Sequence, residues 1–177
     1  DDPAEVEPAA FCALPDTSGP EQYTDAEIRA ILADVRKIAM VGASARWNRP
    51  SYFAMKYLQR KGYQIYPVNP RAKDEPEILG ARSYATLAEV PDKIDMVDIF
   101  RPSEEAGAIV DEAIRIGARV VWMQLGVRDS AAAERAQAAG LHVVTNRCPK
   151  FEFARLCGEL GWNGINTGVL SSRRHSM

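Results

Sequence analysis

Five short segments of the sequence combine turn-forming residues with basic or amide side chains, and each directly follows an apolar run. Glycine lets the backbone turn tightly and approach a ligand, while arginine and lysine supply positive charge. Backbone N–H groups and basic side chains together bind anionic groups such as phosphates. The pattern therefore predicts a nucleotide-like anionic ligand. The five segments are residues 42–51, 68–73, 100–103, 124–127 and 146–150.

The first of these segments gives the strongest indication of a phosphate site. Gly42 permits a tight turn after the apolar run 37–41, and Pro50 is well suited to the first position of a helix. The start of that helix offers unpaired N–H groups and the positive end of the helix dipole. A second interpretation stays open, because any fold of this type needs glycine at this turn and arginines often form a solvated rim. The side chains that would add hydroxyl groups and charge are Ser44, Ser51, Arg46 and Arg49.

The same segment departs from a dinucleotide-binding motif. Ala43, Ser44 and Ala45 follow Gly42 without the second and third glycines of G-x-G-x-x-G. After the next apolar run stands Asn69, where an NAD-binding protein would have an acid for the ribose hydroxyls. The basic residues Arg71 and Lys73 suit an additional phosphate on a ribose. An NAD(P)-linked redox protein is therefore the less favoured alternative.

Cysteine and histidine are too few for most metal or triad chemistry. Cys12, Cys148 and Cys157 are odd in number and form no C-x-x-C pair, so neither a disulfide framework nor a zinc site is expected. His142 and His175 are the histidines, and His142 is expected to be a partly buried strand residue. The cysteine pattern indicates a reducing, cytoplasmic environment. We expect no catalytic residues and no metal site.

Cys148 is the one candidate for a reactive side chain. It lies between Arg147 and Lys150 and just before an expected helix, a setting that lowers the pKa of a thiol. Such a thiol could form a mixed disulfide with a thiol ligand, which would make the protein a redox carrier. The alternative is a small packed residue before Pro149.

Two further features have structural interpretations. Asp95 and Asp98 differ by three positions within an expected strand, so their side chains point to opposite faces and form no carboxylate pair. A strand-edge or loop-facing role is expected for both residues. Trp47 can either stack on a ligand or close the edge of the domain.

The elements that must position these segments alternate between strands and helices. Thr24 and Glu27 form a capping box, and apolar residues at helical spacing follow as far as Val35. A short helix is expected over 86–90, and a long polar loop follows residue 68. Nearly continuous apolar strands between helices predict an α/β, Rossmann-like, doubly wound parallel sheet of about five strands with helices on both faces. The expected strands are 37–42, 63–68, 94–100, 119–124 and 141–145, and the other helices are 50–60, 102–116, 130–139 and 151–160.

Charge is unevenly distributed along the 177 residues, whose formal net charge is −2. Residues 1–22 hold six acids and no bases, whereas the rest holds 22 bases and 18 acids. We therefore expect an acidic flexible leader over 1–22, a binding domain over 23–160 and a loose tail over 161–177. The mild positive charge of the domain suits a small polyanion better than nucleic acid. No secretory signal is visible, and no apolar run reaches the roughly 20 residues of a membrane helix, so no membrane partner is expected.

Three motifs at successive strand ends resemble a known family. They are Val41-Gly42-Ala43-Ser44, Tyr66-Pro67-Val68-Asn69-Pro70 and Cys148-Pro149. In order and spacing they resemble the small stand-alone CoA-binding domain proteins. Those proteins are similar to the N-terminal CoA-binding domain of the succinyl-CoA synthetase α subunit. The resemblance covers roughly residues 24–160.

The resemblance implies that coenzyme A lies across the strand ends. It assigns Gly42, Ala43 and Ser44 to the diphosphate, with help from Arg46, Trp47, Asn48, Arg49, Pro50 and Ser51. Val68, Asn69 and Pro70 would border the adenosine, with Arg71 or Lys73 near its ribose phosphate. Phe100, Arg101 and Pro102 would form a wall beside the adenine and pantetheine. Gln124, Leu125 and Gly126 would line the pantetheine path, and Asn146 and Cys148 would approach the thiol. Asn146 stands where many small relatives have Asp.

The expected function is non-catalytic binding of coenzyme A or an acyl-CoA. The phosphorylated histidine of the synthetase belongs to a second domain, so the resemblance does not carry over the ligase chemistry. The main alternative is a ligase-related subunit that needs a partner chain, and the sequence also leaves a homodimer open.

Overall fold

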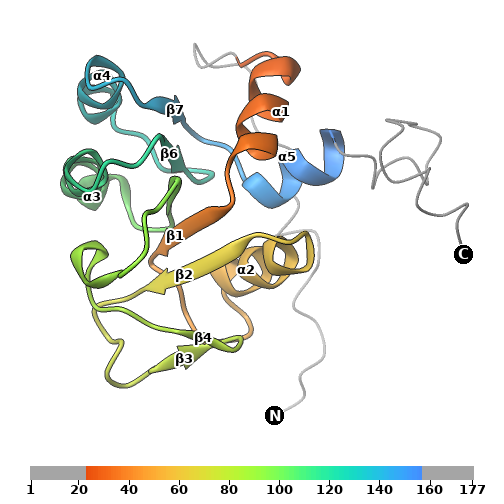
Figure 1. Ribbon diagram of the computed structural model, residues 1–177, viewed down its shortest axis with the longest axis vertical. Coiled ribbons are helices and arrows are strands. Elements are labelled where there is room, and N and C mark those ends of the chain that lie inside the picture. The colour runs from red at the N-terminus through yellow and green to blue at the C-terminus, as the bar shows by residue number, and fades with distance from the viewer. Residues whose placement is uncertain (1–22, 157–177) are drawn as a thin grey trace, which may run out of the picture.

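Five parallel strands form the central sheet of the protein (Figure 1). The computed structural model describes residues 23–156. The strands lie in the order β2-β1-β5-β6-β7, so the chain builds outward from β1 on one side and then continues from β5 on the other. This order confirms the predicted doubly wound, Rossmann-like sheet. The strands are β1 (Lys37–Val41), β2 (Gln64–Val68), β5 (Met96–Ile99), β6 (Val120–Met123) and β7 (His142–Val144).

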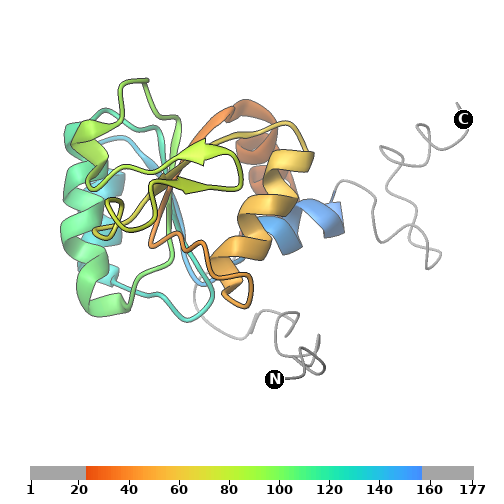
Figure 2. The ribbon, with the colours of Figure 1, turned by 90° about the horizontal axis from the view of Figure 1, so that it is seen from below.

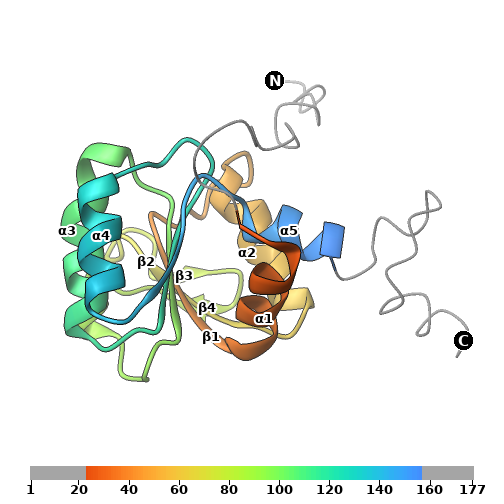
Figure 3. The same ribbon diagram turned by 90° about the horizontal axis from the view of Figure 1, so that it is seen from above.

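Helices cover both faces of the sheet. Figures 2 and 3 show α3 and α4 together on one face, and α1, α2 and α5 on the other. The capping box predicted at Thr24 is present, because its side chain accepts the Glu27 N–H while Glu27 accepts the Thr24 N–H. Pro50 is the first residue of α2, as predicted. The helices are α1 (Asp25–Asp34), α2 (Pro50–Arg60), α3 (Ser103–Arg115), α4 (Ser130–Ala138) and α5 (Pro149–Leu156).

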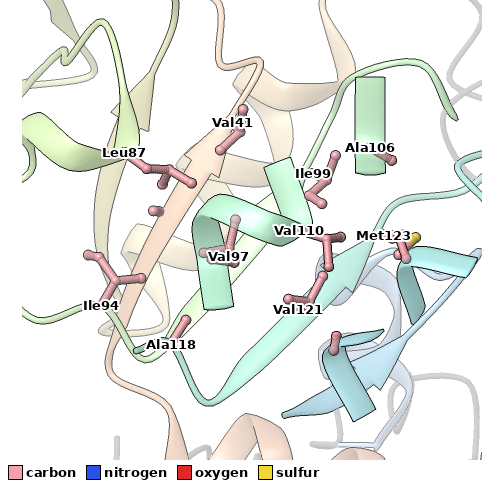
Figure 4. Packing of buried hydrophobic residues seen from close by; sticks show 14 of the residues in the cluster. Val41, Leu87, Ile94, Val97, Ile99, Ala106, Val110, Ala118, Val121 and Met123 are labelled. Atoms are coloured by element: carbon pink, nitrogen blue, oxygen red, sulfur yellow. The ribbon is translucent and has the colours of Figure 1, made fainter. Parts of the chain in front are cut away.

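Alternate residues of each strand enter two separate cores. In β1, Ala39 and Val41 join the cluster beneath α3 and α4, whereas Ile38 and Met40 join the cluster beneath α1, α2 and α5. Figure 4 shows the first cluster, in which Val110 of α3 lies among strand residues such as Val97 and Val121. Burial on both faces explains why the strands read as continuous apolar runs. The polar and charged residues predicted to bind a ligand therefore lie mostly in the loops at the strand ends.

A small hairpin occupies part of the region expected to be a loop. Strands β3 (Glu77–Ile78) and β4 (Ala81–Arg82) pair antiparallel through a turn at Leu79 and Gly80, whose φ angles are +48° and +79°. Strands of two residues are too short to produce an alternating pattern, so the sequence did not reveal them. A single turn of 3₁₀-helix, η2 (Leu87–Glu89), occupies the expected short helix.

The structure leaves several expectations untested. The acidic leader 1–22, the tail 161–177, Cys12, Cys157 and His175 lie outside the described residues. Within residues 23–156, no helix is both long and apolar enough to cross a membrane. His142 proves to be exposed at the start of β7, which corrects the expectation of a partly buried residue.

Gly42 ends β1 where no larger residue fits. Its φ is +92°, and an added Cβ would lie 2.8 Å from the Phe100 carbonyl oxygen and 2.9 Å from Arg101 Cδ. The backbone around it is fixed on both sides, because the Gly42 N–H donates to Val68 O (2.9 Å) and the Phe100 N–H donates to Val41 O (2.8 Å). The turn after β1 is therefore held against the ends of both neighbouring strands.

We predict that Gly42→Ala destabilises the protein far more than Gly62→Ala. Both glycines have φ above +90°, but an added Cβ at Gly62 meets nothing within 4 Å. Gly62→Ala should cost about 1 kcal/mol for backbone strain, and Gly42→Ala about 1–3 kcal/mol more because it also displaces the end of β5. Urea denaturation of the two variants and the wild type measures the difference. Equal losses would show that the contact with Phe100 can relax freely.

Candidate functional site

A cleft of about 400 Å³ lies at the C-terminal ends of β1, β2 and β5. These strands flank the point at which the chain changes direction across the sheet, which is the usual ligand position in open α/β sheets. Its volume lies within the range of small-molecule sites. We call it the basic cleft. It is lined by Gly42, Ala43, Ser44, Arg46, Arg49, Pro50, Ser51, Asn69, Arg71, Glu75, Phe100 and Arg101.

The basic cleft brings together about half of the residues predicted to bind the ligand. Most of the predicted residues that follow β1 and β5 line the cleft, and Asn69 is the predicted residue after β2 that does so. Arg71 also lines the cleft, whereas Lys73 does not. The predicted residues outside its lining are Trp47, Asn48, Val68, Pro70, Lys73, Pro102, Gln124, Gly126, Asn146 and Cys148.

Four arginines give the basic cleft its positive charge. Arg101 forms a two-point ion pair with Glu105 (2.7 Å for both bonds), and Arg71 lies 3.8 Å from Asp74. Within residues 23–156, Arg46 and Arg49 have no ion-pair partner. Arg49 also precedes α2 without capping it through its side chain, and the first turn of α2 contains no acidic residue that would offset the positive end of the helix dipole. The cleft is therefore suited to an anionic group beside the β1–α2 turn, residues 42–49.

Asn69 connects two loops that line the cleft. Its Nδ2 donates to the Ala43 carbonyl oxygen (2.9 Å), and its Oδ1 accepts the Arg71 N–H (2.8 Å). Its backbone N–H donates to Tyr84 O (2.8 Å). The side chain predicted to border a ligand thus also ties the loop after β2 to the β1–α2 turn.

Glu75 is a cleft residue that sequence reasoning missed. Its Oε2 accepts the Ala45 N–H (3.1 Å) and lies 3.4 Å from Asn69 Nδ2. No acidic residue directly follows β2 in the sequence, and Glu75 comes seven positions after Val68. The loop returns it to the strand end through hydrogen bonds that no local pattern predicts. An acid therefore does stand in the cleft, although not at the position used by NAD-binding proteins.

The ends of β6 and β7 form a second group of predicted site residues. The Gly126 N–H donates to Asn146 Oδ1 (2.8 Å), which joins the two loops, and Asn146 has a left-handed φ of +55°. Gln124 Nε2 donates to Asp98 Oδ1 (2.9 Å). Two residues predicted to line a ligand path, Gly126 and Asn146, thus also fix each other, and a third, Gln124, is held by Asp98. The exposed Leu125 lies between Gln124 and Gly126.

Asp98 corrects the expectation of a strand-edge role. It lies in the middle of the sheet opposite Met40 and Trp122, with 0% of its surface exposed. Its Oδ2 has no hydrogen-bond partner among the described residues. Burial raises the pKa of Asp98 to about 7, although the hydrogen bond from Gln124 acts in the opposite direction. A protonated Asp98 therefore coexists with the ionised form near neutral pH.

Cys148 also differs from the expectation. Burial is the main cause that raises the pKa of its thiol to about 11, and the negative charge of Asp98 acts in the same direction. Backbone N–H groups of Phe151 and Lys150 lower the pKa, but by less. The prediction of a lowered thiol pKa is thus wrong, because desolvation outweighs the helix start. The neutral thiol favours the packed residue over the redox carrier.

Other groups of the described chain do not extend the site. A hollow of about 560 Å³ lies at the outer edge of β2 and is lined by residues such as Tyr63, Ile65 and Arg82. None of the predicted ligand residues lines it. Residues 23–156 contain no cluster of three or more His, Cys, Asp or Glu side chains arranged to hold a metal ion.

Known proteins resemble the chain over most of its described length. A family model described as CoA binding domain matches residues 36–154. YneT of Bacillus subtilis (strain 168) is 36% identical over 129 residues, which are 73% of this chain and 93% of YneT. The solved structure of a hypothetical protein from Pyrococcus horikoshii OT3 is 41% identical with a TM-score of 0.75, and the match covers 81% of this chain and 99% of that one.

A larger enzyme subunit matches part of the chain. The alpha subunit of ADP-forming acetate–CoA ligase I from Pyrococcus furiosus is 35% identical over 94 residues. Those residues are 51% of this chain but 20% of the subunit, so the chain corresponds to a small portion of it.

The buried carboxyl of Asp98 predicts an unusual dependence of stability on pH. Its pKa rises from 3.8 to about 7 on folding, so the folded state binds a proton that the unfolded state releases between these values. Stability should therefore fall as pH rises through this range, by up to about 4 kcal/mol. Asp98→Asn, which resembles the protonated form, should be more stable than the wild type at pH 8 and gain less at pH 5. Urea denaturation across this range measures the effect.

Asp95→Asn provides a control, because it should change the stability of the fold in the opposite direction to Asp98→Asn. Burial raises the pKa of Asp95, but the N–H groups of Lys37 and Arg36 and the Arg119 guanidinium together hold it below its usual value. Its ionised form stabilises the fold, so Asp95→Asn should lose stability at both pH values. A loss of stability for Asp98→Asn at pH 8 would mean that the buried carboxylate has a favourable partner.

Proposed function

The chain belongs to the CoA binding domain family, and we propose that it binds coenzyme A or an acyl-CoA, without catalysis, at the C-terminal ends of its strands. The observation that carries this proposal is the basic cleft, which is lined by four arginines, two of which, Arg46 and Arg49, belong to the β1–α2 turn. Coenzyme A carries a diphosphate and a third phosphate on its ribose, so it needs several positive groups within a short distance. The cleft supplies them together with a backbone turn at Gly42, whose positive φ and close approach to Phe100 favour glycine.

The residues of the cleft fit the anionic end of coenzyme A. We assign the diphosphate to the β1–α2 turn, where Arg46 and Arg49 have no ion-pair partner among the described residues. The absence of a Cβ at Gly42 keeps this turn against β5 and open to the ligand. For the ribose phosphate, Arg71 is better placed than Lys73 because it lines the cleft. The exposed Trp47, with 52% of its surface accessible, is available to cover the ligand from outside.

The rest of the ligand would follow the strand ends from β5 towards β7. We place the pantetheine beside Pro102, Gln124 and Gly126, with its thiol end towards Asn146 and Cys148. The bond between Gly126 and Asn146 holds this path in one conformation before a ligand arrives. A neutral Cys148 thiol suits contact with a thiol or thioester better than covalent exchange with it. The protein thus contributes binding and orientation.

Calorimetric titration with coenzyme A, dephospho-CoA, NAD and NADP tests this proposal. Coenzyme A should bind most tightly, and Arg49→Gln should lower its affinity about tenfold because a charge-assisted contact to phosphate is lost. Arg60→Gln is the matched control, since it removes the same charge from the exposed last residue of the same helix. Clear NADP binding without coenzyme A binding would overturn the assignment.

A ligase-related role is the second candidate function. It is favoured by the match to the acetate–CoA ligase alpha subunit, of which this chain corresponds to 20%. In that case the chain would present coenzyme A to an active site supplied by a partner subunit. The exposed side chain of Trp47, which follows the cleft residue Arg46 in the chain, is available to contact such a partner.

Affinity purification from the native cell distinguishes the two functions. A ligase-related subunit should co-purify in a stoichiometric complex with a second chain. The complex should form an acyl-CoA from a carboxylate, coenzyme A and a nucleoside triphosphate, with release of the nucleoside diphosphate and phosphate. A protein recovered as a monomer or homodimer that retains coenzyme A would support the binding function alone.

A further inference from the structure

An acidic side chain occupies the basic cleft. Glu75 lies among Arg46, Arg49, Arg71 and Arg101 in the lining. Its carboxylate accepts the Ala45 N–H at 3.1 Å and lies 3.4 Å from Asn69 Nδ2. A lone carboxylate among basic groups lowers the affinity of a site for anions, so its presence at this position needs a physical reason.

The bond to Ala45 places Glu75 where an anionic ligand would bind. Ala45 lies in the β1–α2 turn, the part of the basic cleft to which we assign the phosphate groups of the ligand. The next N–H, that of Arg46, already donates to Ser44 Oγ (3.2 Å). One N–H serves one strong acceptor at a time, and two anions in contact repel each other. The Glu75 carboxylate and a phosphate oxygen therefore exclude each other at this turn.

The loop that carries Glu75 has a closed backbone, whereas the side chain is held by the contacts of its carboxylate with Ala45 and Asn69. The backbone from Asn69 to Glu75 is closed by hydrogen bonds from Ala72 to Asn69 (2.9 Å) and from Glu75 to Arg71 (3.0 Å). Asn69 anchors the start of this loop to the β1–α2 turn. Glutamate itself is half-buried and has three rotatable side-chain bonds, so it can leave the turn by rotation alone.

We propose that Glu75 is a specificity-determining residue that competes with the phosphate groups of the ligand for the β1–α2 turn. A ligand enters by displacing the carboxylate, and it must offer more negative charge than it removes. A diphosphate meets this condition because it can engage several of the four arginines at once. A carboxylate or an uncharged ligand does not. The inference rests on the proposed function only in the choice of coenzyme A as the natural diphosphate.

Titration of Glu75→Gln with inorganic diphosphate and with coenzyme A tests the competition. The variant keeps the size of the side chain but removes the competing charge, so both ligands should bind about tenfold more tightly than to the wild type. Glu77→Gln is the matched control, because Glu77 is an exposed acid two positions away that does not line the cleft. It should change either affinity less than about twofold. Glu75→Ala should reproduce the gain if the glutamine variant folds poorly.

The outcomes separate this inference from the proposed function. Tighter diphosphate binding by Glu75→Gln, with no coenzyme A binding by any variant, supports the competition and rejects the proposed function. Coenzyme A binding that Glu75→Gln leaves unchanged supports the function and overturns the competition. Weaker coenzyme A binding by Glu75→Gln also overturns it, because Glu75 would then be a ligand contact, such as an acceptor for ribose hydroxyls. The competition is also overturned if inorganic diphosphate binds neither Glu75→Gln nor Glu75→Ala.

An amide resonance gives an independent readout of the same event. In ¹⁵N spectra of the wild type, saturating diphosphate should shift the Ala45 amide, because its acceptor changes from carboxylate to phosphate. Glu75→Gln alone should shift the same resonance before any ligand is added, and Glu77→Gln should not. An Ala45 resonance that responds to neither change would exclude the exchange of acceptors.

Discussion

The close contact between the end of β1 and the end of β5 is the constraint from which the basic cleft follows. At Gly42 the backbone passes so near the Phe100 carbonyl that a single added carbon would collide with it. This contact seats the β1–α2 turn between the ends of β2 and β5. The start of α2, the arginines of the turn and the brace from Asn69 all take their positions from it. The position of the cleft is thus set first by this backbone contact, and the side chains that line the cleft are placed around it.

The sequence predicted those parts of the fold that depend on local or periodic patterns. The capping box at Thr24 and the proline that opens α2 act within a single turn of helix, and the apolar strands follow from burial on both faces. The hairpin at Leu79 and Gly80 was missed because its strands have two residues each. Glu75 was missed for a different reason. Its position depends on contacts with Ala45, thirty residues away in the chain, and such pairings leave no local pattern.

Burial also explains why the titration behaviour of two predicted residues differs from expectation. Sequence reasoning placed Asp98 by its spacing from Asp95 and placed Cys148 by its charged neighbours. Neither observation reports how much solvent reaches the side chain, yet desolvation is the largest contribution to the pKa of both groups. Charged neighbours along the chain therefore predict electrostatics reliably only where a side chain stays in water.

The hairpin after β2 has a consequence for how the molecule behaves at high concentration. Tyr84 donates to Pro67 O (2.9 Å), and the Asn69 N–H donates to Tyr84 O (2.8 Å), so the outer edge of β2 is partly capped. Pro67 has no N–H to offer a neighbouring strand. The other edge strand, β7, is three residues long. An exposed sheet edge is a template for intermolecular pairing, and short or blocked edges suppress it. The segment from Asn69 to Tyr84, which carries Glu75 to the cleft, therefore also blocks part of the outer edge of β2 against pairing with another chain.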